Sequence, residues 1–210
     1  TGSGALSASA AAASRTALGL SPKQDDEIER NAALTVSATR PALERYTGVL
    51  FDALDAASFT RAQEAKARQR LAIGSALFGA VRADDPVPAY RLSGGSALPG
   101  LPTLRALWKP VLPAAVTAAA DGLVVDLRSG IYRDLGPIPG AVTATVLTEQ
   151  PDGSRTVVSH FNKHHKGLLA RALTVTRAEP TSARAVAAVA VRAGLRAEVA
   201  SPTEVIVLTE

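Results

Sequence analysis

The sequence predicts a single α+β domain over residues 21–210, with a mixed sheet and surrounding helices. In the first half of the chain, apolar residues recur at spacings of three and four, which is typical of amphipathic helices. In the second half, β-rich runs are separated by short turn signals, which is typical of β-hairpins. A hydrophobic content of 47% is enough for a proper core, and no clear linker divides the chain after its low-complexity start.

The first half of the chain is predicted to be mainly helical. Residues 1–20 are alanine-rich and carry a single charge, and we assign no function to them. Ser21 and Pro22, followed by three acids, predict a helix start. A second helix is predicted from Pro41, and a third over 61–81, basic at first and then apolar and glycine-containing.

A long loop is predicted over residues 86–95, which hold two prolines and two glycines. Long loops in compact domains are usually functional or disordered, so we expect Tyr90 and Arg91 at the rim of a cleft. The alternative is a surface connection in which Tyr90 merely packs. A helix over 101–120, interrupted by prolines, follows; Trp108 is expected to be a core anchor.

The second half of the chain is predicted to contain most of the strands. The predicted strands are 123–127, 141–148, 155–161, 195–200 and 205–208, with a helix over 181–192 that ends before Gly194. Residues 151–153 form a strong turn signal, so the strands on either side should pair as an antiparallel hairpin. Ser129 and Tyr132 follow a strand and are candidate ligand contacts, although an ordinary turn explains them equally well.

The segment from Ser154 to Arg177 concentrates the polar chemistry of the chain. It contains all three histidines and five basic residues, and it has no Asp or Glu. Asn162 is predicted to cap a helix whose first turn is formed by Lys163, His164, His165 and Lys166. Because a helix N-terminus favours anions, cations there are unfavourable unless something negative lies among them.

This arrangement predicts a phosphate or carboxylate site at the start of the helix. Backbone N–H groups would be reinforced by Lys163 and Lys166, and Gly167 would let a ligand approach the backbone closely. Arg171 lies one turn further along the same face. The alternative is a solvated basic face that carboxylates from elsewhere in the fold neutralise.

Several functional classes are excluded by what the sequence lacks. Without cysteine there is no disulfide, thiolate metal site or cysteine nucleophile, which agrees with a cytosolic setting. No nucleotide-binding loop, zinc-protease helix or serine-hydrolase elbow occurs, and no run approaches a membrane span. Lysines beside His160, His164 and His165 would repel a cation, so we expect no metal and no cofactor.

Three ordered segments resemble the YaaA-type peroxide stress proteins. They are IGSALFGAVRADDPVPAYRL, LVVDLRSGIY and SHFNKHHKGLLAR. The last is similar to that family's Ser-aromatic-x-Lys-Lys-x-Arg-Gly-x-x-x-Arg pattern. Lys163, Gly167 and Arg171 match this pattern, whereas Lys166 replaces an arginine and His164 replaces a lysine.

The resemblance implies a mixed α and β domain with a basic cleft, a cytoplasmic role in limiting iron-linked oxidative damage, and binding of double-stranded DNA. It also implies a helix-hairpin-helix element at 74–79, where the residue pattern alone predicts continuous helix. The family normally opens with a strand and a Ser-Pro-Ala-Lys-like motif, whereas this sequence opens with the low-complexity segment 1–20.

Two functional hypotheses follow. The first is a protein that binds double-stranded or distorted DNA, largely through phosphate contacts of Arg82, Arg91, Lys163, Lys166 and Arg171. The second is an enzyme acting on a nucleotide or another phosphorylated or carboxylated small molecule. Its candidate residues are Tyr90, Arg91, Ser129, Tyr132, Lys163 and His164. The residues leave open whether the protein is an enzyme, and they do not fix its oligomeric state.

Overall fold

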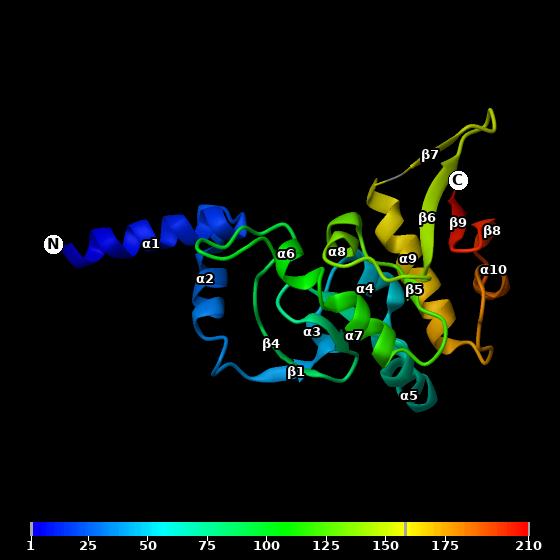
Figure 1. The fold of residues 1–210 in the computed structure, drawn as a ribbon, viewed down its shortest axis with the longest axis horizontal. Coiled ribbons are helices and arrows are strands. Elements are labelled where there is room, and N and C mark those ends of the chain that lie inside the picture. Colours follow the sequence, from blue (N-terminus) through cyan, green and yellow to red (C-terminus); the bar gives the residue numbers. More distant parts are fainter. Residues whose placement is uncertain (1, 158, 210) are drawn as a thin grey trace.

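A five-stranded mixed sheet occupies the C-terminal part of the fold (Figure 1). The computed structural model describes the backbone of residues 2–157 and 159–209 and the side chains of residues 10–157 and 162–209. The strands are β5 (Val125–Asp126), β6 (Val142–Glu149), β7 (Arg155–Val157), β8 (Arg196–Ser201) and β9 (Glu204–Thr209). β6 runs parallel to β5 and β9, whereas β7 and β8 are antiparallel to their partners, which confirms the predicted hairpins and mixed sheet.

One face of this sheet is buried by two helices, α9 (Ser159–Val175) and α10 (Ala183–Arg192). Successive side chains of a strand point to opposite faces, so alternate strand residues enter the core. These residues are Val142, Ala144 and Val146 of β6 and Val205 and Val207 of β9. α10 confirms the predicted helix, and Gly194 after it has φ +88°, as expected just past a helix end.

α9 is the central helix, because both of its sides are covered. Leu169 faces the sheet, whereas Ala170 packs with Leu54 and Phe59 on the opposite side. That second layer is formed by α4 (Val49–Leu54), the 3-10 turn η2 (Ala56–Ser58) and α5 (Arg61–Arg70). A Cβ placed on Gly167 would overlap the backbone carbonyl of Leu50 and approach Ala53 Cβ to 2.7 Å. The absence of a side chain at Gly167 therefore sets how closely α9 and α4 approach.

Two cations of α5 cap the C-terminal end of α9. Lys66 Nζ donates to the carbonyl of Thr176 at 2.7 Å, and Arg70 Nη1 donates to those of Leu173 and Thr176 at 3.0 and 2.8 Å. Helix C-termini leave carbonyl groups without intrahelical partners and carry partial negative charge, so cationic donors are stabilising there. Both side chains are thus used in holding the layers together.

The prediction of one helix over 61–81 is wrong. α5 ends at Arg70, and an antiparallel hairpin follows, formed by β2 (Ala72–Ser75) and β3 (Gly79–Arg82). Ser75 Oγ accepts hydrogen bonds from the backbone N–H groups of Leu77 and Phe78, and Gly79 has φ +74°, so the turn is locally determined. A β-hairpin also stands where the family resemblance implied a helix-hairpin-helix element, and that expectation is wrong here too.

The remaining described elements are further helices and one pair of short strands. The helices are α1 (Gly2–Leu18), η1 (Pro22–Gln24), α2 (Asp25–Ala32), α3 (Ala42–Arg45), α6 (Leu104–Trp108), α7 (Leu112–Ala119) and α8 (Gly130–Asp134). The two further strands, β1 (Thr39–Pro41) and β4 (Pro86–Pro88), pair with each other. α1 extends away from the body of the protein (Figure 1).

Two of the predicted elements are shorter in the structure than expected. The helix predicted from Pro41 is divided before Val49, where Gly48 has φ +111°. The strand predicted over 123–127 pairs only at Val125 and Asp126. By contrast, the proline interruption of the helix predicted over 101–120 is confirmed, and Trp108 anchors the hairpin by donating from Nε1 to the carbonyl of Ala76 at 2.9 Å.

We expect Gly167→Ala to destabilise the protein by about 1–3 kcal/mol, because the new methyl group must push α9 away from the α4 backbone. Urea denaturation measures this free energy of unfolding. Gly130→Ala is the matched control, since nothing lies within 4 Å of a Cβ there, and it should change stability by less than about 1 kcal/mol. Equal stabilities of the two variants would contradict the close contact of α4 and α9.

Candidate functional site

The basic segment lies one turn deeper in α9 than predicted. The helix begins at Ser159, so Lys163, His164, His165 and Lys166 form its second turn and Asn162 lies inside it. The prediction that Asn162 caps the helix is therefore wrong, as is the strand predicted as far as Phe161, since β7 ends at Val157. Val158 and the side chain of His160 lie outside the described residues. The free N–H groups of the helix start are not the feature that gathers these cations.

Gly167 and Arg171 contribute to the contact between α9 and α4. A ligand has no room beside Gly167, because the backbone of Leu50 occupies that space. Arg171 donates to the carbonyls of Leu54 and Asp55, both at 2.8 Å, and its guanidinium lies 5.1 Å from the ring centroid of Phe59. Arg171 thus caps α4 much as the α5 cations cap α9.

Lys166 is the basic residue of this segment that enters the protein interior. Only 7% of its surface is exposed, whereas Lys163, three residues earlier, is exposed. Burial lowers the pKa of Lys166, the nearby Arg133 lowers it further, and Asp126 opposes this shift. Among the described residues, no carboxylate oxygen lies within 4.0 Å of the Lys166 Nζ atom. An ammonium group is therefore buried beside another cation.

Asp126, the acid whose charge acts on Lys166, is already ion-paired with Arg128. Nε and Nη2 of Arg128 donate to the two carboxylate oxygens at 2.9 and 2.8 Å, and the Arg128 backbone N–H donates to Oδ1 at 3.1 Å. Arg128 also donates to the carbonyl of Gly136 at 2.8 Å, and its stem covers Gly74 of the hairpin. This buried pair joins the end of β5 to the hairpin and leaves Lys166 and Arg133 without a carboxylate of their own.

Asn162 adds a second unsatisfied group on the same helix. Its Oδ1 is buried and has no hydrogen-bond partner in the described part of the structure. Asn162 and Lys166 are four residues apart, and residues at this spacing share one face of a helix. Buried polar atoms are almost always hydrogen-bonded. The free acceptor of Asn162, one turn from the uncompensated ammonium of Lys166, therefore marks a place where a ligand could supply the missing partners.

Hydrogen bonds of its hydroxyl group to two neighbouring side chains hold Tyr90 in place. Its hydroxyl lies 2.6 Å from that of Tyr46 and 2.7 Å from Oγ of Ser75. Ser75 Oγ already accepts two backbone N–H groups, so its own hydrogen points to Tyr90, which in turn donates to Tyr46. Burial raises the pKa of Tyr90, so the phenol stays protonated and is not a general base at neutral pH. The packing alternative for Tyr90 describes its surroundings best.

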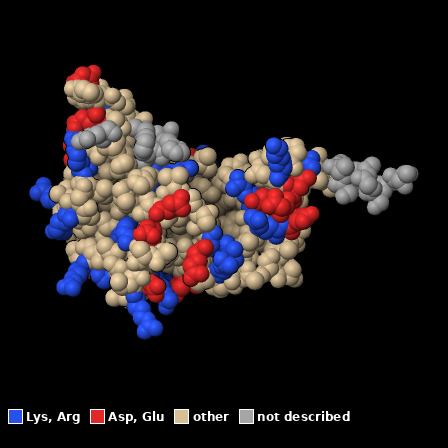
Figure 2. Space-filling model, turned by 180° about the vertical axis from the view of Figure 1, so that it is seen from behind, with Lys and Arg blue, Asp and Glu red and all other residues tan. Residues whose placement is uncertain are grey.

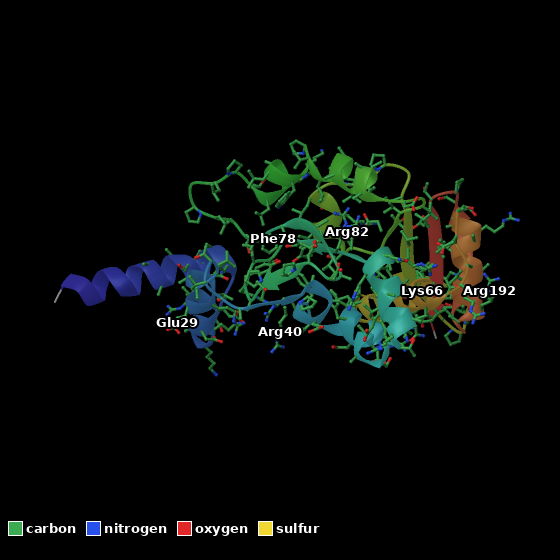
Figure 3. The ribbon with its side chains drawn as sticks, turned by 90° about the horizontal axis from the view of Figure 1, so that it is seen from below. Glu29, Arg40, Lys66, Phe78, Arg82 and Arg192 are labelled. Atoms are coloured by element: carbon green, nitrogen blue, oxygen red, sulfur yellow. The ribbon has the colours of Figure 1, made fainter. Side chains whose placement is uncertain are left out.

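The other predicted contacts do not gather around one cavity. Tyr132 packs against the core cluster that contains Leu135, whereas Ser129 is exposed and caps α8 without a side-chain hydrogen bond. Arg82 and Arg91 are both exposed. In Figure 3, Arg82 on the hairpin lies apart from Arg192 at the end of α10.

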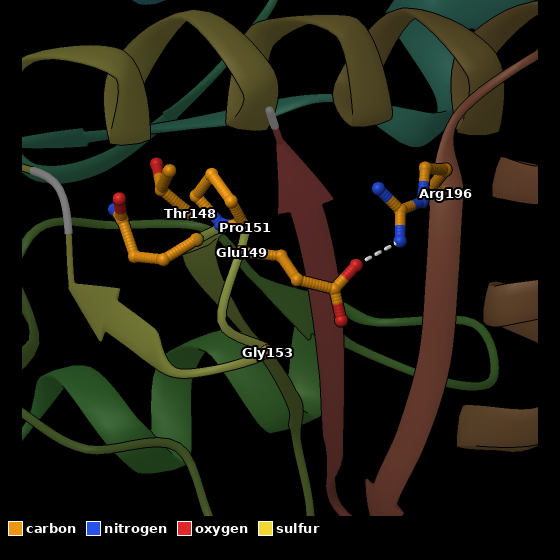
Figure 4. A pocket seen from close by; sticks show the side chains of 6 residues that line it. Thr148, Glu149, Pro151, Gly153 and Arg196 are labelled. Carbon is orange, nitrogen blue, oxygen red and sulfur yellow. Dashed lines mark hydrogen bonds and ion pairs between the residues drawn. The ribbon is translucent and has the colours of Figure 1, made fainter.

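A hollow of about 570 Å³ lies elsewhere, at the turn between β6 and β7 (Figure 4). It is lined by Thr148, Glu149, Gln150, Pro151, Gly153 and Arg196, and Glu149 is ion-paired with Arg196. A smaller hollow of about 130 Å³ lies between α7 and the loop before β6. Neither is lined by a predicted site residue or is predominantly basic. Acidic and basic side chains are interspersed on the face in Figure 2, which shows no basic cleft.

The described residues contain neither a metal-binding cluster nor a membrane-spanning helix. No cluster of three or more His, Cys, Asp or Glu side chains there is arranged to hold a metal ion. No helix in the described part of the chain is both long enough and apolar enough to cross a membrane.

Sequence analysis missed Asp126, Arg128 and Arg133, and it expected Asn162 only to cap the helix. One signal was present, because Asp126 interrupts an apolar strand and a charge in such a strand needs a partner. Arg128, two residues later, lies on the same side of an extended chain and is that partner. Arg133 carried no local signal, since its charge acts on Lys166 only in the folded chain.

Comparison with known proteins identifies close relatives. A family model described as "Peroxide stress protein YaaA" matches residues 4–194. A UPF0246 protein of Corynebacterium glutamicum is 51% identical over 185 residues, covering 86% of this chain and 74% of the relative. A UPF0246 protein of Streptomyces coelicolor is 44% identical over 169 residues, covering 79% of this chain and 65% of the relative. One of Dinoroseobacter shibae is 33% identical over 147 residues, covering 66% of this chain and 55% of the relative.

We expect Lys166→Met to raise the free energy of unfolding at pH 7 by about 1 kcal/mol or more in phosphate-free buffer, because it removes an uncompensated buried charge. The unfolded chain holds the Lys166 proton more tightly than the folded chain does. Wild-type stability should therefore rise as the pH increases towards the ordinary lysine pKa of 10.5, and the advantage of the variant should shrink.

Denaturant unfolding between pH 7 and pH 10 measures this difference. Lys163→Met is the matched control and should change stability by no more than about 0.5 kcal/mol, since Lys163 is exposed. A Lys166→Met protein that is less stable than wild type at pH 7 would show instead that the ammonium is compensated within the fold.

Proposed function

Because the chain belongs to the peroxide stress protein YaaA family, we propose that it serves the peroxide stress response in the cytoplasm by binding double-stranded or distorted DNA through phosphates. The family assignment supplies the physiological setting. Double-stranded DNA is the partner that the family resemblance implies, and the exposed charge of this chain supports an anionic partner.

The observation that carries the proposal is a set of exposed cations without acidic partners. Arg82, Arg91 and Lys163 are exposed, and the described side chains place no carboxylate in an ion pair with any of them. The acid-free segment 86–120 adds exposed Arg105 and Lys109. Exposed cations that are not neutralised internally are available to replace the counterions of nucleic-acid phosphates.

The fold constrains how such binding would work. The β2–β3 hairpin replaces the expected helix-hairpin-helix element, so phosphate contacts would come mainly from side chains and not from that motif. α5 is rich in Arg and Gln, but its Lys66 and Arg70 are engaged with carbonyls at the end of α9, so this helix is packed within the fold and is not free to read base edges. We therefore propose binding with little sequence preference.

The enzyme hypothesis has less support than the DNA-binding hypothesis. An enclosed pocket lined by Tyr90, Ser129, Tyr132 and His164 would favour it, but the two hollows described above are lined by other residues. The raised pKa of Tyr90 also removes one of its candidate bases. A phosphorylated small molecule, the ligand of that hypothesis, would still suit the cations around Lys166, which is buried, unlike the exposed cations.

We expect the affinity for duplex DNA to fall steeply with salt, and each of Arg82→Ala, Arg91→Ala and Lys163→Ala to reduce the log–log slope by about one unit. Fluorescence anisotropy of a labelled duplex over a salt series measures the slope. Arg192→Ala is the control, because Arg192 is exposed but lies at the sheet end, away from Arg82 (Figure 3). A salt-independent affinity would refute phosphate-dominated binding.

A further inference from the structure

Around the start of α9, three elements bring together more positive charge than the protein neutralises. We call Lys166, Arg133, Asn162 and the Asp126–Arg128 pair the Lys166 cluster. It contains three cations and one carboxylate, and that carboxylate is held by Arg128 in two hydrogen bonds. Arg133 is half-buried and has no acidic partner among the described residues. Desolvating such charges is unfavourable unless an anion compensates them.

We propose that Lys166, Arg133 and Asn162 form a binding site for a terminal phosphate group, that is, a phosphomonoester. This site goes beyond the proposed duplex binding and does not depend on it, since it uses interior groups and not the exposed cations. The ammonium of Lys166 and the guanidinium of Arg133 would bind the phosphate oxygens. The charge of the ligand would supply what the fold lacks.

Asn162 specifies the kind of anion. Its buried Oδ1 is a free acceptor, so a matching ligand must bring a donor next to its negative oxygens. Inorganic phosphate carries a P–O–H group beside its charged oxygens at neutral pH, and a phosphomonoester carries one in its monoanionic form, which prevails below its second pKa of about 6. Sulfate has the same shape and charge but no proton to donate. The cluster should therefore prefer phosphate to sulfate.

Burial distinguishes a terminal phosphate from one within a nucleic-acid chain. Lys166 is 7% exposed, so a ligand reaches it only with a small, tapering end. A phosphodiester carries a sugar on both sides, whereas a phosphomonoester presents three free oxygens. The group could come from a small phosphorylated molecule or from the phosphorylated end of a DNA strand, and its chemistry at the cluster is the same.

The first test is ligand-dependent stabilisation of the full chain in a buffer free of other oxyanions. Inorganic phosphate should raise the wild-type melting temperature in a saturable way, and sulfate at equal ionic strength should raise it less. Lys166→Met should raise the dissociation constant for phosphate about tenfold or more, whereas the control Lys23→Met, at an exposed position of η1, should leave it within about twofold. Arg133→Gln, at a half-buried position, should weaken phosphate binding in the same direction.

Equal phosphate affinity in wild type and Lys166→Met would overturn the proposal, and so would equal affinity for phosphate and sulfate. The melting curve of each variant without ligand shows whether it is folded. If Lys166→Met did not fold, Arg133→Gln would decide the matter: unchanged phosphate affinity in that variant would overturn the site.

A second set of titrations identifies the source of the phosphate and separates this site from duplex binding. A nucleoside 5′-monophosphate is compared with its nucleoside, and a 5′-phosphorylated oligonucleotide with its 5′-hydroxyl form. Preference for the phosphorylated member of either pair supports the site and names its source, whereas no preference in both pairs overturns it. Lys166→Met should keep the wild-type salt slope for a blunt duplex with 5′-hydroxyl ends, so either function can fail without the other.

Discussion

The contact between α4 and α9 is the constraint on which the rest of the fold depends. Because Gly167 has no side chain, the backbone of α9 can lie against the carbonyl of Leu50. This approach brings Arg171 within reach of the last carbonyls of α4, and the caps from α5 then hold the far end of α9. With α9 fixed on this side, its other side is presented to β6 and β9, so one glycine links the helical layer to the sheet.

This arrangement also determines which cations are available for binding. Lys66, Arg70 and Arg171 donate to helix carbonyls, and Arg128 is held by Asp126, so four basic side chains serve the architecture. A formal net charge of +4 therefore says little about where an anion would bind. What matters is that some cations are exposed and unpaired, whereas Lys166 is buried and unpaired. These two groups suit different ligands, a polyanion outside and a single small anion inside.

Much of the fold could be predicted from local sequence patterns, and the predictions that failed did so for a common physical reason. Alternation over 142–149, the turn at 151–153 and Gly194 are local signals, and the structure confirms the elements they predict. The hairpin after Arg70 was missed because its apolar residues, among them Ile73, also fit helical spacing. Its strand conformation is favoured by distant partners, since Ile73 packs with Ala42 and Val87. Sequence spacing cannot show a packing partner that comes from another part of the chain.

The candidate site shows the same limit, because Lys166 was chosen for a reason that the structure removes. Its placement in the first turn of a helix suggested an anion, yet α9 starts earlier and the cation lies a turn further in. What makes Lys166 unusual is its own burial, together with the charges of Arg133 from α8 and Asp126 from β5 that act on it. Charge alone is common on protein surfaces and is worth little there. A buried charge, by contrast, is unfavourable unless an opposite charge lies beside it. The fold, more than the charge pattern, therefore indicates where a ligand belongs.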